Sequence, residues 1–134
     1  MPTRRIFSLT LLATCAATLS TPTLAQAPYP DRPVKVIVAL PAGGSVDMIA
    51  RLVSQKLAAE MGQPFVVDNR AGASGQIGVP VVAKSAPDGY TLLLCDVGAL
   101  AISPSVYTKL PFDPSKDLRG VAMLAYSPHL LVVH

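Results

Sequence analysis

The sequence contains few of the residues that build catalytic or metal centres. Its two histidines, His129 and His134, lie near the C-terminal end, and no cysteine or further histidine stands at a metal-ligand spacing from them. The Gly-x-Ser-x-Gly pattern of serine hydrolases is absent, and the eight acidic residues are scattered, with no close pair suited to general acid and base work. The sequence therefore predicts no metal site, no cofactor and no catalytic residue.

Aromatic side chains are also scarce, at 5% of the 134 residues, and no run of lysine and arginine could follow a phosphate backbone. These two absences argue against a nucleic-acid-binding surface. The glycines at 72, 75 and 78 have the wrong spacing for the dinucleotide fingerprint, and the phosphate-binding P-loop also needs a lysine followed by serine or threonine. Nucleotide binding is therefore not predicted.

The first 25 residues have the pattern of an export signal. Arg4 and Arg5 form a basic start, residues 6–19 form a moderately apolar stretch, and residues 23–25 suit a signal peptidase, so we expect the mature chain to begin at Gln26. A membrane anchor is the alternative, but the apolar run is shorter than the roughly 18 residues that span a bilayer. The arginine pair also resembles a twin-arginine signal, and the choice between that route and the Sec route stays open.

Loss of this leader changes what the charge and the cysteines imply. The formal net charge of +3 includes Arg4 and Arg5, so nine basic and eight acidic residues remain and the net charge falls to +1. Cys15 also lies in the leader, which leaves Cys95 without an intramolecular disulfide partner. Cys95 stands in an apolar run, so we expect a buried small side chain rather than a reactive thiol.

The mature part alternates between strand and helix patterns, which is typical of a parallel α/β sheet. Residues 34–40 are almost continuously apolar and β-branched, as in a strand covered on both faces. Residues 46–61 carry apolar side chains at three- and four-residue spacing, and Gly62 then stops the helix. The pattern continues with a strand at 65–68, a helix at 74–86 and a strand at 90–95, whose three leucines predict full burial.

Pro80 disturbs the second helix, because proline in a regular helix interior costs about 3 kcal/mol. Either the helix kinks there or its regular part begins near Val79. The later pattern predicts a helical turn at 102–107, an extended loop at 110–114, and strands at 121–125 and 130–133. The last of these ends at His134 without a turn or a cap, so we expect part of the protein to be missing.

Three loops follow the carboxyl ends of the first three strands, where open α/β sheets bind ligands. They span residues 41–47, 68–74 and 96–99. In the first loop, Gly43 and Gly44 allow close backbone approach at a helix start, where free amides and the helix dipole favour an anion. A tight turn with no ligand role explains this glycine pair about as well.

Three polar side chains in these loops each allow two interpretations. Ser45 can cap the helix or donate its hydroxyl to a ligand. Asp47 is either a first-turn acid favoured by the helix dipole or a direct ligand contact, and the first interpretation is slightly preferred. Arg70 pairs either with a bound carboxylate or with Asp68, and the structural pair is preferred.

Taken together, the motifs resemble those of a known receptor family. Three segments occur in order between Tyr29 and Val133: LPAGGSVDMIARLVSQKLAAEMGQPFVVDNRAGASGQIG, VAKSAPDGYTLLL and ISPSVYTKLPFDPSKDL. In combination they closely resemble the substrate-binding receptors of tripartite tricarboxylate transporters, the Bug-type periplasmic proteins. The resemblance implies an α/β fold of the type II periplasmic-binding-protein class, a Venus flytrap with mainly parallel sheets. It also implies that the protein captures a small organic carboxylate in the periplasm and delivers it to inner-membrane transporter subunits.

The same resemblance implies a domain organisation. Residues 1–25 would be the signal peptide, residues 26–125 the first lobe, and residues 126–134 the start of the crossover toward a second lobe that the chain lacks. Members of the family are not enzymes, and one lobe alone is not expected to bind. The alternative is an exported α/β enzyme or a structural module that shares the strand-turn-helix unit. Which carboxylate is bound, and the oligomeric state, stay open.

In such receptors backbone groups and ordered waters hold most of the ligand carboxylate, so the resemblance points to loop positions. It implies ligand contacts at Gly43, Gly44, Ser45, Asp47, Asn69, Ser74, Val97 and Gly98. The chain departs from the family pattern at Ala71 and Gly120, where proline is common, and at Pro80, where it is not. Of these departures, only Pro80 is expected to change the local backbone geometry.

Overall fold

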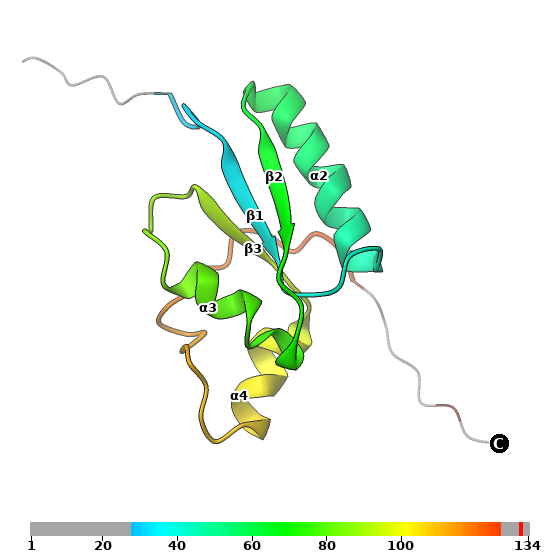
Figure 1. Ribbon diagram of the computed structural model, residues 1–134, viewed down its shortest axis with the longest axis vertical. Helices are drawn as coiled ribbons and strands as arrows, with labels where there is room; N and C mark the ends of the chain where they lie inside the picture. The colour runs from blue at the N-terminus through cyan, green and yellow to red at the C-terminus, as the bar shows by residue number, and fades with distance from the viewer. Residues whose placement is uncertain (1–27, 127–131, 133–134) are drawn as a thin grey trace, which may run out of the picture.

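Three parallel strands form the sheet that organises this chain, and the computed structural model describes residues 28–126 and residue 132 (Figure 1). The strands are β1 (Val34–Val38), β2 (Phe65–Asn69) and β3 (Thr91–Leu94), in the order β2-β1-β3. Val34 of β1 pairs with Phe65, and Lys35 pairs with Thr91. The central strand is the apolar, β-branched one, and its Val34, Ile37 and Val38 side chains are fully buried. The predicted parallel α/β arrangement is confirmed.

Helix α2 (Ser45–Met61) connects β1 to β2 and packs on both strands. Its predicted apolar stripe lies toward the sheet: Ala50 is buried, the terminal Met61 is 37% exposed, and the other members are partly buried, namely Val46, Ile49, Val53 and Leu57. Gly62 ends the helix in the left-handed conformation, with a φ of 71°, and its N–H donates to the Ala58 carbonyl at 3.1 Å. The predicted start and stop of this helix are therefore confirmed to within one residue.

The second predicted helix is divided into two pieces. A short turn, η1 (Ala73–Gly75), comes first, and the regular helix α3 (Gly78–Ala83) follows it. Pro80 thus falls in the first turn of α3, where backbone amides have no partner inside the helix and the missing N–H costs little. The prediction that the regular part begins near Val79 is confirmed, and the helix does not run through 74–86.

Helices α2 and α3 lie on opposite sides of the sheet (Figure 1). The chain passes from β1 to β2 on one side and then crosses over β1 to reach β3 on the other side. Because both crossovers are right-handed, their helices lie on opposite faces of the sheet. The direction of the connections therefore reverses between β1 and β3. In open α/β sheets of this order, that point is where a crevice forms.

A small apolar core lies between α3 and the end of the sheet. Its buried members are Ala39, Val79, Ala99 and Phe112. The prediction of full burial for the leucines of β3 is wrong, because all four residues of this strand are only partly buried. Within the described residues, β3 stands at the edge of the sheet, so no strand covers its far side.

The end of the described chain corrects a second prediction. The helical turn expected at 102–107 is present as η2 (Gly98–Ile102), a stretch of π-helix, followed by α4 (Ser103–Val106). Residues 121–125 do not form the expected strand, because no neighbouring strand pairs with them among the described residues; Val121 is 88% exposed. The export signal, the strand at 130–133 and both histidines lie outside the described residues, apart from Val132. None of the helices placed in 28–126 is long and apolar enough to cross a membrane.

Candidate functional site

The loop that joins β1 to α2 is held in place by the carboxylate of Asp47. This side chain is buried, at 3% exposure, and it accepts hydrogen bonds from three donors. The Gly43 amide donates to Oδ2 at 2.8 Å, Arg51 Nε donates to Oδ2 at 3.0 Å, and Asn69 Nδ2 donates to Oδ1 at 2.9 Å. Asp47 therefore occupies the structural role of a first-turn acid and also fixes the glycine loop.

The same donors explain the acidity of Asp47. The hydrogen bond from Arg51, then those from the Gly43 amide and Asn69, lower the pKa of the Asp47 carboxyl from 3.8 to about 2. The carboxylate is thus ionised throughout the physiological range. Its charge is paired with that of Arg51, whose side chain is 56% exposed.

Asn69 ties the ends of two strands together. Its Nδ2 donates to the Leu40 carbonyl after β1, at 3.3 Å, as well as to Asp47, and its Oδ1 accepts from Arg51 Nη2 at 3.1 Å. We call Asp47, Arg51, Asn69 and the Gly43 amide the Asp47 cluster. Arg51 was not predicted as a site residue, although its i,i+4 spacing from Asp47 on a helix was a usable signal.

The positive end of α2 remains open beside this cluster. The residue preceding the helix is Gly44, which has no side chain to cap it, and no side-chain cap hydrogen bond is present. Ser45 is the first helical residue, so the first of its two interpretations, that it caps the helix, is wrong. Gly44 and Ser45 are exposed. The first-turn amides thus lack the side-chain oxygen that usually satisfies them.

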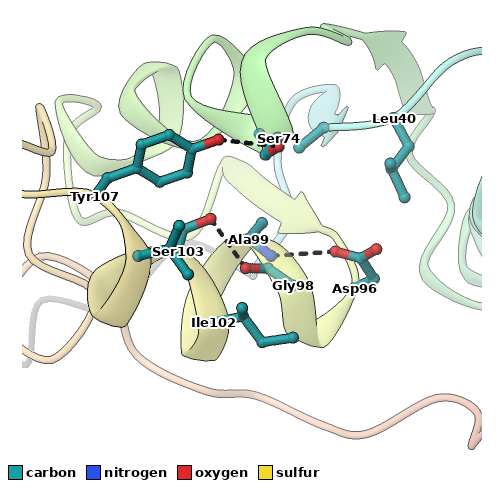
Figure 2. Close-up of a pocket in the computed structure, with 11 residues that line it drawn as sticks. Leu40, Ser74, Asp96, Gly98, Ala99, Ile102, Ser103 and Tyr107 are labelled. Atoms are coloured by element: carbon teal, nitrogen blue, oxygen red, sulfur yellow. Dashed lines mark hydrogen bonds between the residues drawn. The ribbon is translucent and has the colours of Figure 1, made fainter.

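A hollow of about 340 Å³ lies where β1 and β3 finish (Figure 2). Its position matches the reversal point between these two strands, and its volume suits a small ligand. Leu40 joins the two regions, because it lines the hollow while its carbonyl accepts from Asn69. The lining comprises Ala39, Leu40, Ser74, Gly75, Asp96, Gly98, Ala99, Ile102, Ser103, Val106 and Tyr107.

Polar groups in the hollow are held by local hydrogen bonds. Tyr107 donates its hydroxyl to Ser74 Oγ at 3.5 Å, and Ser103 donates its hydroxyl to the Gly98 carbonyl at 3.0 Å (Figure 2). The Ala99 amide donates to Asp96 Oδ1 at 3.2 Å. The contact of Tyr107 with Ser74 joins the segment after β3 to the loop after β2, so the hollow is built from segments far apart in sequence.

The backbone on one side of the hollow is strained. Ala73 and Ser74 have φ angles of 46° and 52°, in the left-handed region that side chains disfavour, and Gly75 follows at 88°. Such outliers gather at ligand sites, where the surrounding structure holds them in place. This strain marks residues 73–75 as a candidate binding segment.

The predicted site residues therefore divide into two adjacent groups. Gly43, Gly44, Ser45, Asp47 and Asn69 lie at the start of α2. Ser74 and Gly98 line the hollow, whereas Val97 is 63% exposed and does not line it. The predicted site residues did not include Asp96, Ser103 and Tyr107, although Asp96 lies in the third predicted loop, directly after a predicted strand.

The structure decides between the alternative interpretations of Arg70 and Cys95. Arg70 pairs with Asp68 at 3.1 Å, as preferred. Cys95 is partly buried against the apolar core, and burial, with a smaller contribution from the Asp96 charge, raises the pKa of its thiol to about 11. Within residues 28–126, no group of three or more potential metal ligands is present.

Comparisons with known proteins all identify the same receptor family. The family described as "Tripartite tricarboxylate transporter family receptor" matches residues 49–134. Protein BugT of Bordetella pertussis is 47% identical over 107 residues, which cover 79% of this chain and 33% of BugT.

Two solved structures from Rhodopseudomonas palustris are similar in fold. MatC with bound malate is 38% identical, with a TM-score of 0.68, over 72% of this chain and 33% of MatC. Rpa4515 with adipate is 41% identical, with a TM-score of 0.62, over 65% of this chain and 29% of that protein. The chain thus spans about a third of the length of the proteins it matches.

Proposed function

Because this chain belongs to the tripartite tricarboxylate transporter receptor family, we propose that it is part of a periplasmic receptor that captures a small carboxylate and delivers it to inner-membrane transporter subunits. The family match over residues 49–134 carries this proposal. It is supported by the similar proteins solved with malate and with adipate, both of which are small carboxylates.

The proposed division of the chain follows the expectation from its sequence. Residues 1–25 direct export, residues 26–125 form the first lobe, and residues 126–134 lead toward a second lobe. Such receptors gain affinity when two lobes enclose the ligand and exclude water. One lobe supplies only part of the contacts, so the 134-residue chain alone is expected to bind carboxylates too weakly to measure.

The ligand would bind across the two adjacent regions of the site. Its carboxylate would accept hydrogen bonds from the first-turn amides of α2, near Gly44 and Ser45, where the positive helix end favours an anion. Asp47 places a negative charge near the same helix end, but Arg51 offsets it at 3.0 Å. The remainder of the ligand would enter the hollow beside Ser74 and Gly98.

Each predicted residue has a place in this proposal. Gly44 and Ser45 contact the carboxylate through their backbone. Gly43, Asp47 and Asn69 position that backbone through the hydrogen bonds already described. Ser74 and Gly98 contact the ligand in the hollow, and Val97, exposed beside it, would meet the ligand or the second lobe only when the lobes close.

Paired substitutions at Ser45 test the role of the amide. Ser45→Pro removes the N–H at the first helical position, where proline is well tolerated, and Gly44 already has a compatible backbone with φ −78° and ψ 171°. Ser45→Ala removes only the hydroxyl and is the matched control. We expect Ser45→Pro to weaken binding about tenfold or more and Ser45→Ala to change it little, because hydrogen bonds to a charged group contribute about 1.5–3 kcal/mol.

The binding measurement is isothermal titration calorimetry on the protein expressed from its complete gene, with a panel of mono-, di- and tricarboxylates. At least one acid is expected to bind, and the separate 26–134 segment is expected to show no measurable heat. If no carboxylate binds the complete protein, the proposed function is wrong. Equal affinity for the segment and the complete protein would refute the two-lobe account.

A further inference from the structure

The hollow contains one fixed charge, and that charge is negative. Among the eleven lining residues only Asp96 has a side chain that is charged at neutral pH, and no described lysine or arginine lines the hollow. The four ion pairs of the described residues do not include Asp96. A site for anions thus presents an unneutralised carboxylate to its ligand.

One carboxylate oxygen of Asp96 is fixed by a hydrogen bond and the other can accept one from a ligand. Its Oδ1 accepts the Ala99 amide at 3.2 Å, while Oδ2 has no hydrogen-bond partner among the described residues. The neighbouring Gly98 leaves space beside the carboxylate, because a Cβ at that position would lie 3.3 Å from Oδ1 and 3.7 Å from Oδ2. Figure 2 places Asp96 and Leu40 at one end of the lining and Tyr107 at the other. Leu40, at the same end of the lining as Asp96 in Figure 2, is linked to the Asp47 cluster, because its carbonyl accepts from Asn69 Nδ2 at 3.3 Å.

An ionised carboxylate only accepts hydrogen bonds. It repels a second carboxylate placed in the same hollow. A ligand group that donates a hydrogen bond turns this repulsion into attraction, and a positively charged donor gives the strongest such bond. Asp96 therefore distinguishes acids that also carry a hydrogen-bond donor from acids that do not.

We propose that Asp96 makes this receptor select carboxylates that also carry a hydrogen-bond donor, with an ammonium group preferred to a hydroxyl and a hydroxyl preferred to hydrogen. The inference rests on the proposed function, because it assumes that a carboxylate binds at this edge of the sheet. In this arrangement the ligand carboxylate lies at the α2 amides and the donor lies against Asp96.

The test uses three series of acids that differ only in the group on the carbon next to one carboxylate. These are succinate, malate and aspartate; glutarate, 2-hydroxyglutarate and glutamate; and propionate, lactate and alanine. Calorimetry on the protein expressed from its complete gene gives the dissociation constants. In at least one series we expect the amino acid to bind at least about tenfold more tightly than the unsubstituted acid, since hydrogen bonds between charged groups are the strong ones.

Asp96→Asn should reduce this preference by about tenfold or more while the unsubstituted acid binds equally well or better. Glu60→Gln is the matched control, because it removes the same charge from an exposed position on α2 outside the hollow. Asp96→Ser is a second variant that keeps an oxygen for the Ala99 amide, and thermal unfolding of each variant checks that it is folded.

The possible results distinguish failure of the Asp96 role from failure of the proposed receptor function. An unchanged preference in both folded Asp96 variants, or a wild-type preference for unsubstituted acids, overturns the role of Asp96 while leaving a carboxylate receptor. Loss of preference in Glu60→Gln as well would show a general charge effect and also overturn it. If no acid in these series or in the wider carboxylate panel binds, the proposed function fails and the inference fails with it.

Discussion

Two glycines beside the hollow exclude a side chain for different reasons, and this difference predicts how alanine affects stability. Gly75 has a φ of +88°, and a Cβ there would lie 2.8 Å from Ala99 Cβ. Gly78 has no positive φ, but its Cβ would lie 2.8 Å from the Arg70 carbonyl oxygen and 3.0 Å from Ala39 Cα. Contacts this short require the backbone to move.

The expected magnitudes follow from these two causes. The left-handed conformation costs an L residue about 1–2 kcal/mol, and an inserted methyl group in a packed site costs about 1–3 kcal/mol. Gly75→Ala incurs both costs, about 2–5 kcal/mol. Gly78→Ala incurs only the second, reduced by up to about 1 kcal/mol because alanine favours the helix. For a domain of about 100 residues, each kcal/mol lowers Tm by about 4–8 °C.

Two other glycines provide matched controls. Gly62 has a φ of +71°, and a Cβ there would have nothing within 4 Å, so Gly62→Ala incurs only the conformational cost. Gly120 has neither a positive φ nor a close neighbour, so Gly120→Ala is expected to stay within about 0.5 kcal/mol of the wild type. The assay is urea unfolding followed by circular dichroism, with every variant made in the same length of protein. If Gly75→Ala is as stable as Gly120→Ala, the arrangement of residues 73–75 against Ala99 is wrong.

Two further predictions concern ionisation. The pKa of Asp47 is lowered to about 2, below the ordinary value of 3.8, so its carboxylate stabilises the fold fully above about pH 4 and this contribution disappears as the pH falls toward 2. The difference in urea midpoint between wild type and Asp47→Asn should therefore shrink over that window, and a difference that stays constant would contradict the Asp47 cluster. The pKa of Cys95 is raised to about 11, so iodoacetamide at pH 8 should modify it at least about tenfold more slowly than in urea-unfolded protein. Site-resolved mass spectrometry measures both rates, and equal rates would show that Cys95 is not buried.

Local patterns predicted most of the sheet and the first helix. The β-branched run at 34–40 predicts a strand, the apolar spacing in 46–61 predicts a helix, and Gly62 marks the end of that helix. Pro80 signalled that the second helix was irregular. The strand predicted at 121–125 is absent. An apolar run forms a strand only where a partner strand lies beside it, and the sequence of the run does not show whether such a partner is present.

The sequence predicted which loops lie together but not how they are connected. The rule that ligands bind at the carboxyl ends of strands led to the edge of the sheet where the Asp47 cluster and the hollow lie. It could not show that Asp47 already occupies the Gly43 amide, because that contact depends on the conformation of the loop. Nor could it show the hollow, since Ser74, Asp96 and Tyr107 are brought to its lining only after both crossovers have folded.

The most direct test of the central claim is a crystal structure of the protein expressed from its complete gene with its acid bound. We expect a ligand carboxylate oxygen within hydrogen-bonding distance of the first-turn amides of α2, and the rest of the ligand in the hollow beside Ser74 and Gly98. A ligand that contacts neither the 43–47 loop nor the hollow would contradict the account.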